Sequence, residues 1–150
     1  MQLDDAVERA IINDTTIDST EKDAVVKARR GQGKFRRNLE SIERQCRVTG
    51  VTDQRLLRAS HIKPWRSCEN NHERLDGYNG LLLAPHIDHL FDHGYISFED
   101  NGRLLLSPRI ANGEYEKLGI RSSGSANVGA FRSEQAHYLA HHRIKIFKFG

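Results

Sequence analysis

The pattern of hydrophobic and polar positions predicts two paired strands in the middle of the chain. In the segment LLRASHI, Leu57, Ala59 and His61 lie two residues apart, which is the period of a strand, and a proline follows shortly after. A polar loop from Arg66 to Gly77 separates this segment from the apolar run GLLLA, which begins directly after Asn79. The two runs therefore predict the strands of a wide hairpin.

The period changes to that of a helix directly after the second strand. Between His86 and His93, Ile87, Leu90 and Phe91 form one stripe on a helical wheel. This stripe would pack onto the hairpin, so residues 56–94 are predicted to form a strand–strand–helix core.

Scaffold elements are predicted on both sides of this core. Helices over 19–30 and 33–45 form a helical lead-in (19–45), and residues 95–107 form a second hairpin around an Asn-Gly turn. Ser133 caps a C-terminal helix over 133–147. Three histidines on that helix are interpreted as covering the core or a partner rather than binding metal: His137, His141 and His142. The fold class is α+β, with residues 1–150 forming one domain.

Two groups of possible metal ligands share the predicted helix of the core. Asp88 and Asp92 lie one turn apart on one flank of the apolar stripe. His86, His89 and His93 lie on the other flank. Both groups have ligand-type side chains, so spacing alone does not choose between them.

Three segments in order, SHIKPW, YNGLLLAP and HIDHLFDHG, resemble the HNH (ββα-metal, His-Me finger) nuclease family, in its restriction-type branch. The resemblance covers about residues 29–98. It implies that His61 is the general base and that Asn79 begins the second strand and pins the long loop. It also implies that Asp88, nine residues after the asparagine, and Asp92 are the metal pair.

The implied activity is metal-dependent hydrolysis of DNA phosphodiester bonds, which leaves 5′-phosphate and 3′-hydroxyl ends. Many HNH enzymes carry an Asp or His ligand just before the base, where this chain has Ser60. Two carboxylates, water and phosphate oxygens suit a hard ion, so Mg²⁺ or Mn²⁺ is preferred, with Zn²⁺ or Ni²⁺ as alternatives. Whether His86 or His89 completes the site stays open.

A dense basic segment precedes the core. ARRGQGKFRRNLE resembles the lead-in of the same HNH branch, in which Phe35 and Leu39 would anchor a helix. The alternative is a solvated basic face, whereas the DNA-binding interpretation predicts salt-sensitive phosphate contacts to double-stranded DNA. The residues predicted to face DNA are Arg30, Gln32, Lys34, Arg36 and Arg37.

Composition agrees with this interpretation. The formal net charge is +3 and the sequence pI is about 9.0, whereas residues 1–23 are rich in acids. No transmembrane run or signal peptide is visible, so a soluble cytoplasmic protein is expected. Cys46 and Cys68 form no C-x-x-C pair, which excludes a four-cysteine zinc site within one chain and favours Cys46 as a small buried hydrophobe.

Each candidate residue taken singly has an ordinary explanation. An Asn-Gly pair is a common turn, and aspartates on a helix flank are usually solvated. The joint spacing is what favours a nuclease. Two alternatives remain open: a DNA-binding module weakened through Ser60, and an effector domain of a larger restriction or defence protein. Whether the chain forms a homodimer or acts beside a targeting domain also stays open.

Overall fold

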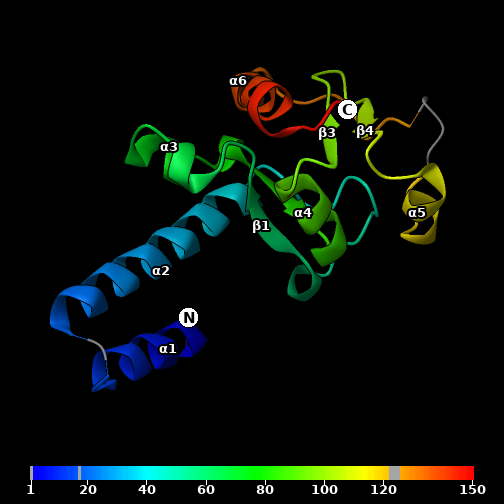
Figure 1. The fold of residues 1–150 in the computed structure, drawn as a ribbon. Helices are drawn as coiled ribbons and strands as arrows, with labels where there is room; N and C mark the ends of the chain where they lie inside the picture. The colour runs from blue at the N-terminus through cyan, green and yellow to red at the C-terminus, as the bar shows by residue number, and fades with distance from the viewer. Residues whose placement is uncertain (1, 17, 122–125) are drawn as a thin grey trace.

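The structure is a computed structural model that describes residues 2–16, 18–121 and 126–150. Its helices and strands follow one another along the chain as Figure 1 shows. The α-helices are α1 (Gln2–Asn13), α2 (Ser19–Glu40), α3 (Asn71–Leu75), α4 (Pro85–Asp92), α5 (Asn112–Lys117) and α6 (Ser133–His141). The strands are β1 (Arg58–His61), β2 (Gly80–Leu83), β3 (Ile96–Phe98) and β4 (Leu104–Leu106). Short 3₁₀ turns η1 (Gln54–Leu56), η2 (Trp65–Ser67) and η3 (Gly77–Asn79) join them, and η4 (His142–Ile146) is a π-helical turn.

The predicted strand–strand–helix core is confirmed. Strands β1 and β2 are antiparallel, and their register pairs Arg58 with Leu83 and His61 with Gly80. Helix α4 follows β2 at once, because a proline at its first position is already set for helical geometry and ends the strand. The apolar stripe of α4 is buried, as its period predicted. The α+β fold class with a ββα centre is therefore correct.

The helical lead-in differs from the prediction. One helix, α2, runs from residue 19 to residue 40, whereas two helices over 19–30 and 33–45 were expected. Glycines weaken a helix by about 1 kcal/mol each, but the buried side chains of Phe35 and Leu39 anchor this helix to the core and hold it continuous. Its N-cap is Asp18, whose carboxylate accepts the backbone N–H of Glu21 at 2.8 Å.

The second hairpin and the C-terminal helix are present with changed bounds. Strands β3 and β4 pair in antiparallel fashion across the Asn-Gly turn, where Gly102 has a φ of 93°. The predicted helix 133–147 becomes α6 and then the π-helical turn η4. Arg132, not Ser133, is the N-cap, and its backbone N–H donates to the side-chain oxygen of Gln135 at 2.9 Å.

The hydrophobic core contains side chains from the inner half of α2, both hairpins, α4, α5 and α6, whereas α3 contributes none. Figure 1 shows α1 alongside the outer half of α2, on the side away from α6 and the second hairpin. Helices α1, α3 and α5 were not predicted: α3 and α5 are too short for a clear helical period, whereas the amphipathic period of α1 was overlooked. Cys46 is fully buried, as expected, and both cysteines are free thiols. None of the helices in the described ranges combines the length and the apolar character needed to cross a membrane.

Candidate active site

Four of the predicted site residues line one cavity of about 410 Å³ between β1, α4 and the loop after β1. His61 lies at the end of β1, and Asp88 and Asp92 come from α4. Gln32 reaches the cavity from α2. The other lining residues are Ala59, Ser60, Pro64, Trp65 and Arg66.

The imidazole of His61 is held between aromatic rings. The ring of Phe35 stacks on it, with centroids 3.6 Å apart and an interplanar angle of 14°, and Trp65 meets it edge-on at 5.6 Å. Gly80 lies opposite His61 in the hairpin, and a Cβ there would come within 2.6 Å of the Phe35 ring. The glycine therefore lets α2 approach β2 closely enough for this stack to form.

A hydrogen bond sets the tautomer of His61. Its Nε2 lies 2.8 Å from the carbonyl oxygen of Arg74, and because a carbonyl only accepts, Nε2 carries the proton. Nδ1 is then the nitrogen with a free lone pair. Burial lowers the pKa of His61 below its usual 6.5, against the smaller opposing effect of the Arg74 carbonyl. The neutral, proton-accepting form is thus the stable one at neutral pH.

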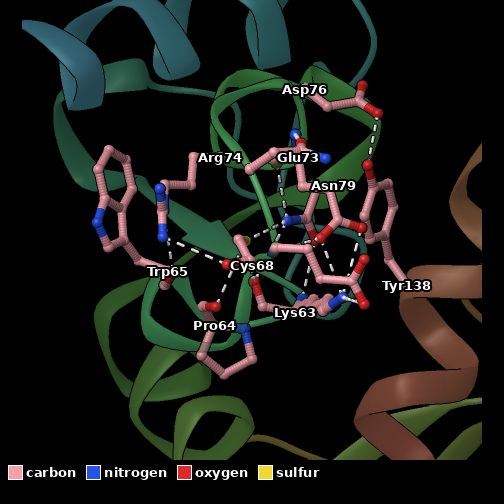
Figure 2. A network of polar contacts seen from close by, with 11 residues as sticks. Lys63, Pro64, Trp65, Cys68, Glu73, Arg74, Asp76, Asn79 and Tyr138 are labelled. Carbon is pink, nitrogen blue, oxygen red and sulfur yellow. Dashed lines mark hydrogen bonds and ion pairs between the residues drawn. The ribbon is translucent and has the colours of Figure 1, made fainter.

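Asn79 joins the two ends of the loop that carries this carbonyl. Its side-chain oxygen accepts the backbone N–H of Lys63 at 2.8 Å. Its amide nitrogen donates to the carbonyls of Lys63 at 3.2 Å and Glu73 at 3.1 Å (Figure 2). Because Glu73 directly precedes Arg74, these bonds also place the Arg74 carbonyl that orients His61. The hydrogen bonds expected of this asparagine are therefore present, and its contribution to catalysis stays a prediction.

Two further contacts stabilise the loop between β1 and β2. The Lys63 ammonium pairs with the Glu73 carboxylate at 3.0 Å, with both side chains largely shielded from solvent. The Tyr138 hydroxyl of α6 donates to the Asp76 carboxylate at 2.7 Å, as Figure 2 shows. Burial is the main cause that raises the pKa of this hydroxyl, so it remains a donor at all ordinary pH values.

The two flanks of α4 have different surroundings. Asp88, half-buried, and Asp92, exposed, face the cavity of His61, whereas the residues that line it do not include His86 or His89. Over the described part of the chain, neither carboxylate makes an ion pair or a hydrogen bond, which leaves both free to bind a cation. No three His, Cys, Asp or Glu side chains in residues 2–16, 18–121 and 126–150 cluster as a metal site. The carboxylate pair fits a hard cation that water and phosphate oxygens also coordinate.

The basic residues of α2 are divided among different environments. Arg30 pairs with Glu8 of α1 at 2.9 Å and remains mostly exposed. Arg36 donates to the Glu40 carboxylate and to the carbonyls of Leu57 and Gln54, so its guanidinium connects α2 to the segment before β1. Lys34 and Arg37 are exposed, and Lys34 lines a second cavity beside α3.

Sequence reasoning did not find three features of the site. The Phe35 ring was expected only to anchor a helix, and the Arg74 carbonyl carries no side-chain signal at all. Arg66 lines the cavity although it lies outside the basic segment of α2. Its place directly after SHIKPW, in the turn that follows the base, was the available signal.

Part of this chain is similar to known proteins. Residues 46–99 match the model of a family described as HNH endonuclease. Among solved structures, the chain is similar to a modification-dependent TagI restriction endonuclease, with 15% sequence identity and a TM-score of 0.42. That similarity covers 79% of this chain and 36% of the other chain. A comparison with curated proteins found no match.

Proposed function

We propose that this chain, whose residues 46–99 match the HNH endonuclease family, hydrolyses double-stranded DNA with His61 as general base and one divalent cation on Asp88 and Asp92. The observation that carries the proposal is the single cavity that these three side chains line. A base and an acidic cation-binding pair on either side of one cavity are the parts that phosphodiester hydrolysis requires.

His61 would take a proton from the attacking water through Nδ1. The Arg74 carbonyl holds Nε2 in its protonated state, and the Phe35 stack prevents the ring from turning away. A neutral imidazole whose pKa is lowered by burial is a competent base under physiological conditions. Asn79 is a positioning residue in this scheme, because it acts through the loop that carries the carbonyl.

Asp88 and Asp92 would hold the cation. When bound, a divalent ion supplies Lewis-acid stabilisation of the charge that develops on the phosphate and the leaving oxygen. Two carboxylate oxygens favour Mg²⁺ or Mn²⁺ over Zn²⁺ or Ni²⁺, since hard cations prefer hard oxygen donors. Ser60 is buried directly before the base, and its neutral hydroxyl adds little to the affinity for a cation.

The DNA path includes Gln32 in the cavity, the exposed Lys34 and Arg37 on α2, and Arg30, which would have to exchange its ion pair with Glu8 for a phosphate. A role for Arg36 in this path stays a prediction, since its donors are directed to protein acceptors. We place the activity in restriction or defence, inside the cytoplasm, because the motifs resemble the restriction-type branch. In that role a second copy of the chain or a separate targeting domain would select the DNA.

Nicking of supercoiled plasmid tests the proposal. The purified chain is incubated with Mg²⁺, Mn²⁺, Ni²⁺ or Zn²⁺, with EDTA as the control, and relaxed and linear products are measured. Cleavage with Mg²⁺ or Mn²⁺ is expected, and the absence of cleavage with every cation would instead support a weakened DNA-binding module.

The variant His61→Ala identifies the base. Loss of a general base typically lowers the rate by about 10² to 10⁴, while binding of a cation and of DNA should remain, because the imidazole is neither a ligand nor a phosphate contact. Cleavage by His61→Ala at the wild-type rate would refute the mechanism.

A further inference from the structure

The cavity of the proposed active site has one cationic side chain among its described lining residues, Arg66. It lies in the turn η2, directly after Trp65, whose ring edge contacts His61. The backbone of Arg66 therefore follows directly on a residue that contacts His61. No part of the basic segment on α2 supplies a cation to this cavity, although Gln32 reaches it.

The neighbouring cations of the loop are already paired. Lys63 binds the Glu73 carboxylate, and the Arg74 guanidinium donates to the side chain of Asn71 and to the carbonyl of Cys68. By contrast, the Arg66 side chain is exposed and makes no ion pair or hydrogen bond with any other described residue. A ligand in the cavity would thus find its guanidinium available.

The charge balance of the cavity favours a positively charged side chain beside the phosphate. Asp88 and Asp92 carry two negative charges, which one divalent cation balances. A phosphodiester that enters the cavity then adds one negative charge, and this charge increases during attack by water. Arg66 supplies one matching positive charge, and its planar donors fit two phosphate oxygens.

We propose that Arg66 binds the scissile phosphodiester and stabilises its transition state, an inference that rests on the proposed nuclease function. As a catalytic residue, Arg66 would contact the non-bridging oxygens of the phosphate that is cleaved. It would add to the cation's stabilisation of the phosphate and would take no part in proton transfer.

The variants Arg66→Ala and Arg66→Lys test the assignment in steady-state cleavage. Arg66→Ala should lower kcat by about 10²-fold, the usual effect of removing one donor to a developing oxyanion, with a smaller change in KM. Arg66→Lys keeps the charge but loses the planar fork, so it should recover part of the activity. Arg58→Ala is the matched control, because Arg58 is exposed on the same hairpin and does not line the cavity.

Equilibrium binding to a DNA duplex, measured in a His61→Ala background, gives a second result that does not depend on activity. Removal of Arg66 should flatten the log–log salt dependence by about 0.9, the contribution of one phosphate contact. An unchanged slope together with wild-type kcat would overturn the inference and leave the proposed function intact. A flatter slope with unchanged kcat would assign Arg66 to a phosphate that is not cleaved. If the wild-type chain cleaves with no cation, both the inference and the proposed function fail.

Discussion

At the scale of single residues, the site depends on groups that act through position rather than through their own reactivity. The carbonyl of Arg74 selects the tautomer of His61, and the Phe35 ring selects its orientation. Neither group can exchange a proton with water at neutral pH. The reactivity of the imidazole is therefore determined by Arg74 and Phe35, which lie 13 and 26 residues away in the sequence, respectively.

The metal ligands can be distinguished by single substitutions. Asp88→Ala and Asp92→Ala should each weaken Mn²⁺ binding strongly, because each removes one of the two charged ligands that we propose. His89→Ala should have a small effect, since His89 is exposed and does not line the cavity. Titration calorimetry with Mn²⁺ measures all three affinities. The choice of flank would be wrong if His89→Ala abolished binding while both aspartate variants retained it.

At the scale of elements, α2 has two kinds of basic side chain. The guanidinium of Arg36 is half-buried and donates to the carbonyls of Leu57 and Gln54, which docks the helix against the start of β1. Lys34 and Arg37, by comparison, point to solvent. A dense basic segment in a sequence can thus contribute both to the fold and to a ligand surface.

Arg36→Ala should therefore lower the stability of the protein. Loss of the donors to two backbone carbonyls is expected to reduce the free energy of unfolding by about 1–3 kcal/mol, measured by urea denaturation. The double variant Lys34→Ala, Arg37→Ala is the control: its stability should stay within about 0.5 kcal/mol of wild type, while its DNA affinity falls. Equal stability of Arg36→Ala and wild type would show that these hydrogen bonds contribute nothing measurable.

At the scale of the whole molecule, the C-terminal segment contacts both the loop that carries Asn79 and the end of α4, the two parts that border the proposed active site. Tyr138 of α6 binds the loop that carries Asn79, through Asp76. His142, one turn further on, donates from Nε2 to the carbonyl of Phe91 at the end of α4 and accepts from the Ser97 hydroxyl. His142 is buried and covers the core, as expected for it, whereas His137 is exposed and its interpretation stays a prediction.

This buried histidine should make stability depend on pH. Burial lowers the pKa of His142 to about 4, below its value of 6.5 in an unfolded chain. The unfolded state therefore binds more protons between these two values, so the free energy of unfolding decreases as pH falls from about 6.5 to about 4. The difference corresponds to about 3 kcal/mol. Denaturation curves of wild type and His142→Gln across this range measure it, and a parallel decline in both proteins would refute the assignment.

The sequence by itself determined the elements whose signals are local. A two-residue period identified β1 and β2, the change to a helical period identified α4, and the Asn-Gly pair identified the second hairpin. The segments SHIKPW, YNGLLLAP and HIDHLFDHG were also sufficient to indicate a resemblance to HNH endonucleases, whose family model matches residues 46–99. These features could be predicted because strand and helix periods place neighbouring side chains on a face before any distant contact forms.

The tertiary structure alone decided what depends on distant parts of the chain. It placed the aspartate flank of α4, rather than the histidine flank, beside His61. It also kept α2 continuous through two glycines and directed Arg36 to carbonyls about 20 residues away in sequence. Hydrogen-bond acceptors of the backbone, such as the Arg74 carbonyl, are the same for every residue type. Their effect on a side chain is therefore known only when the fold brings the two together.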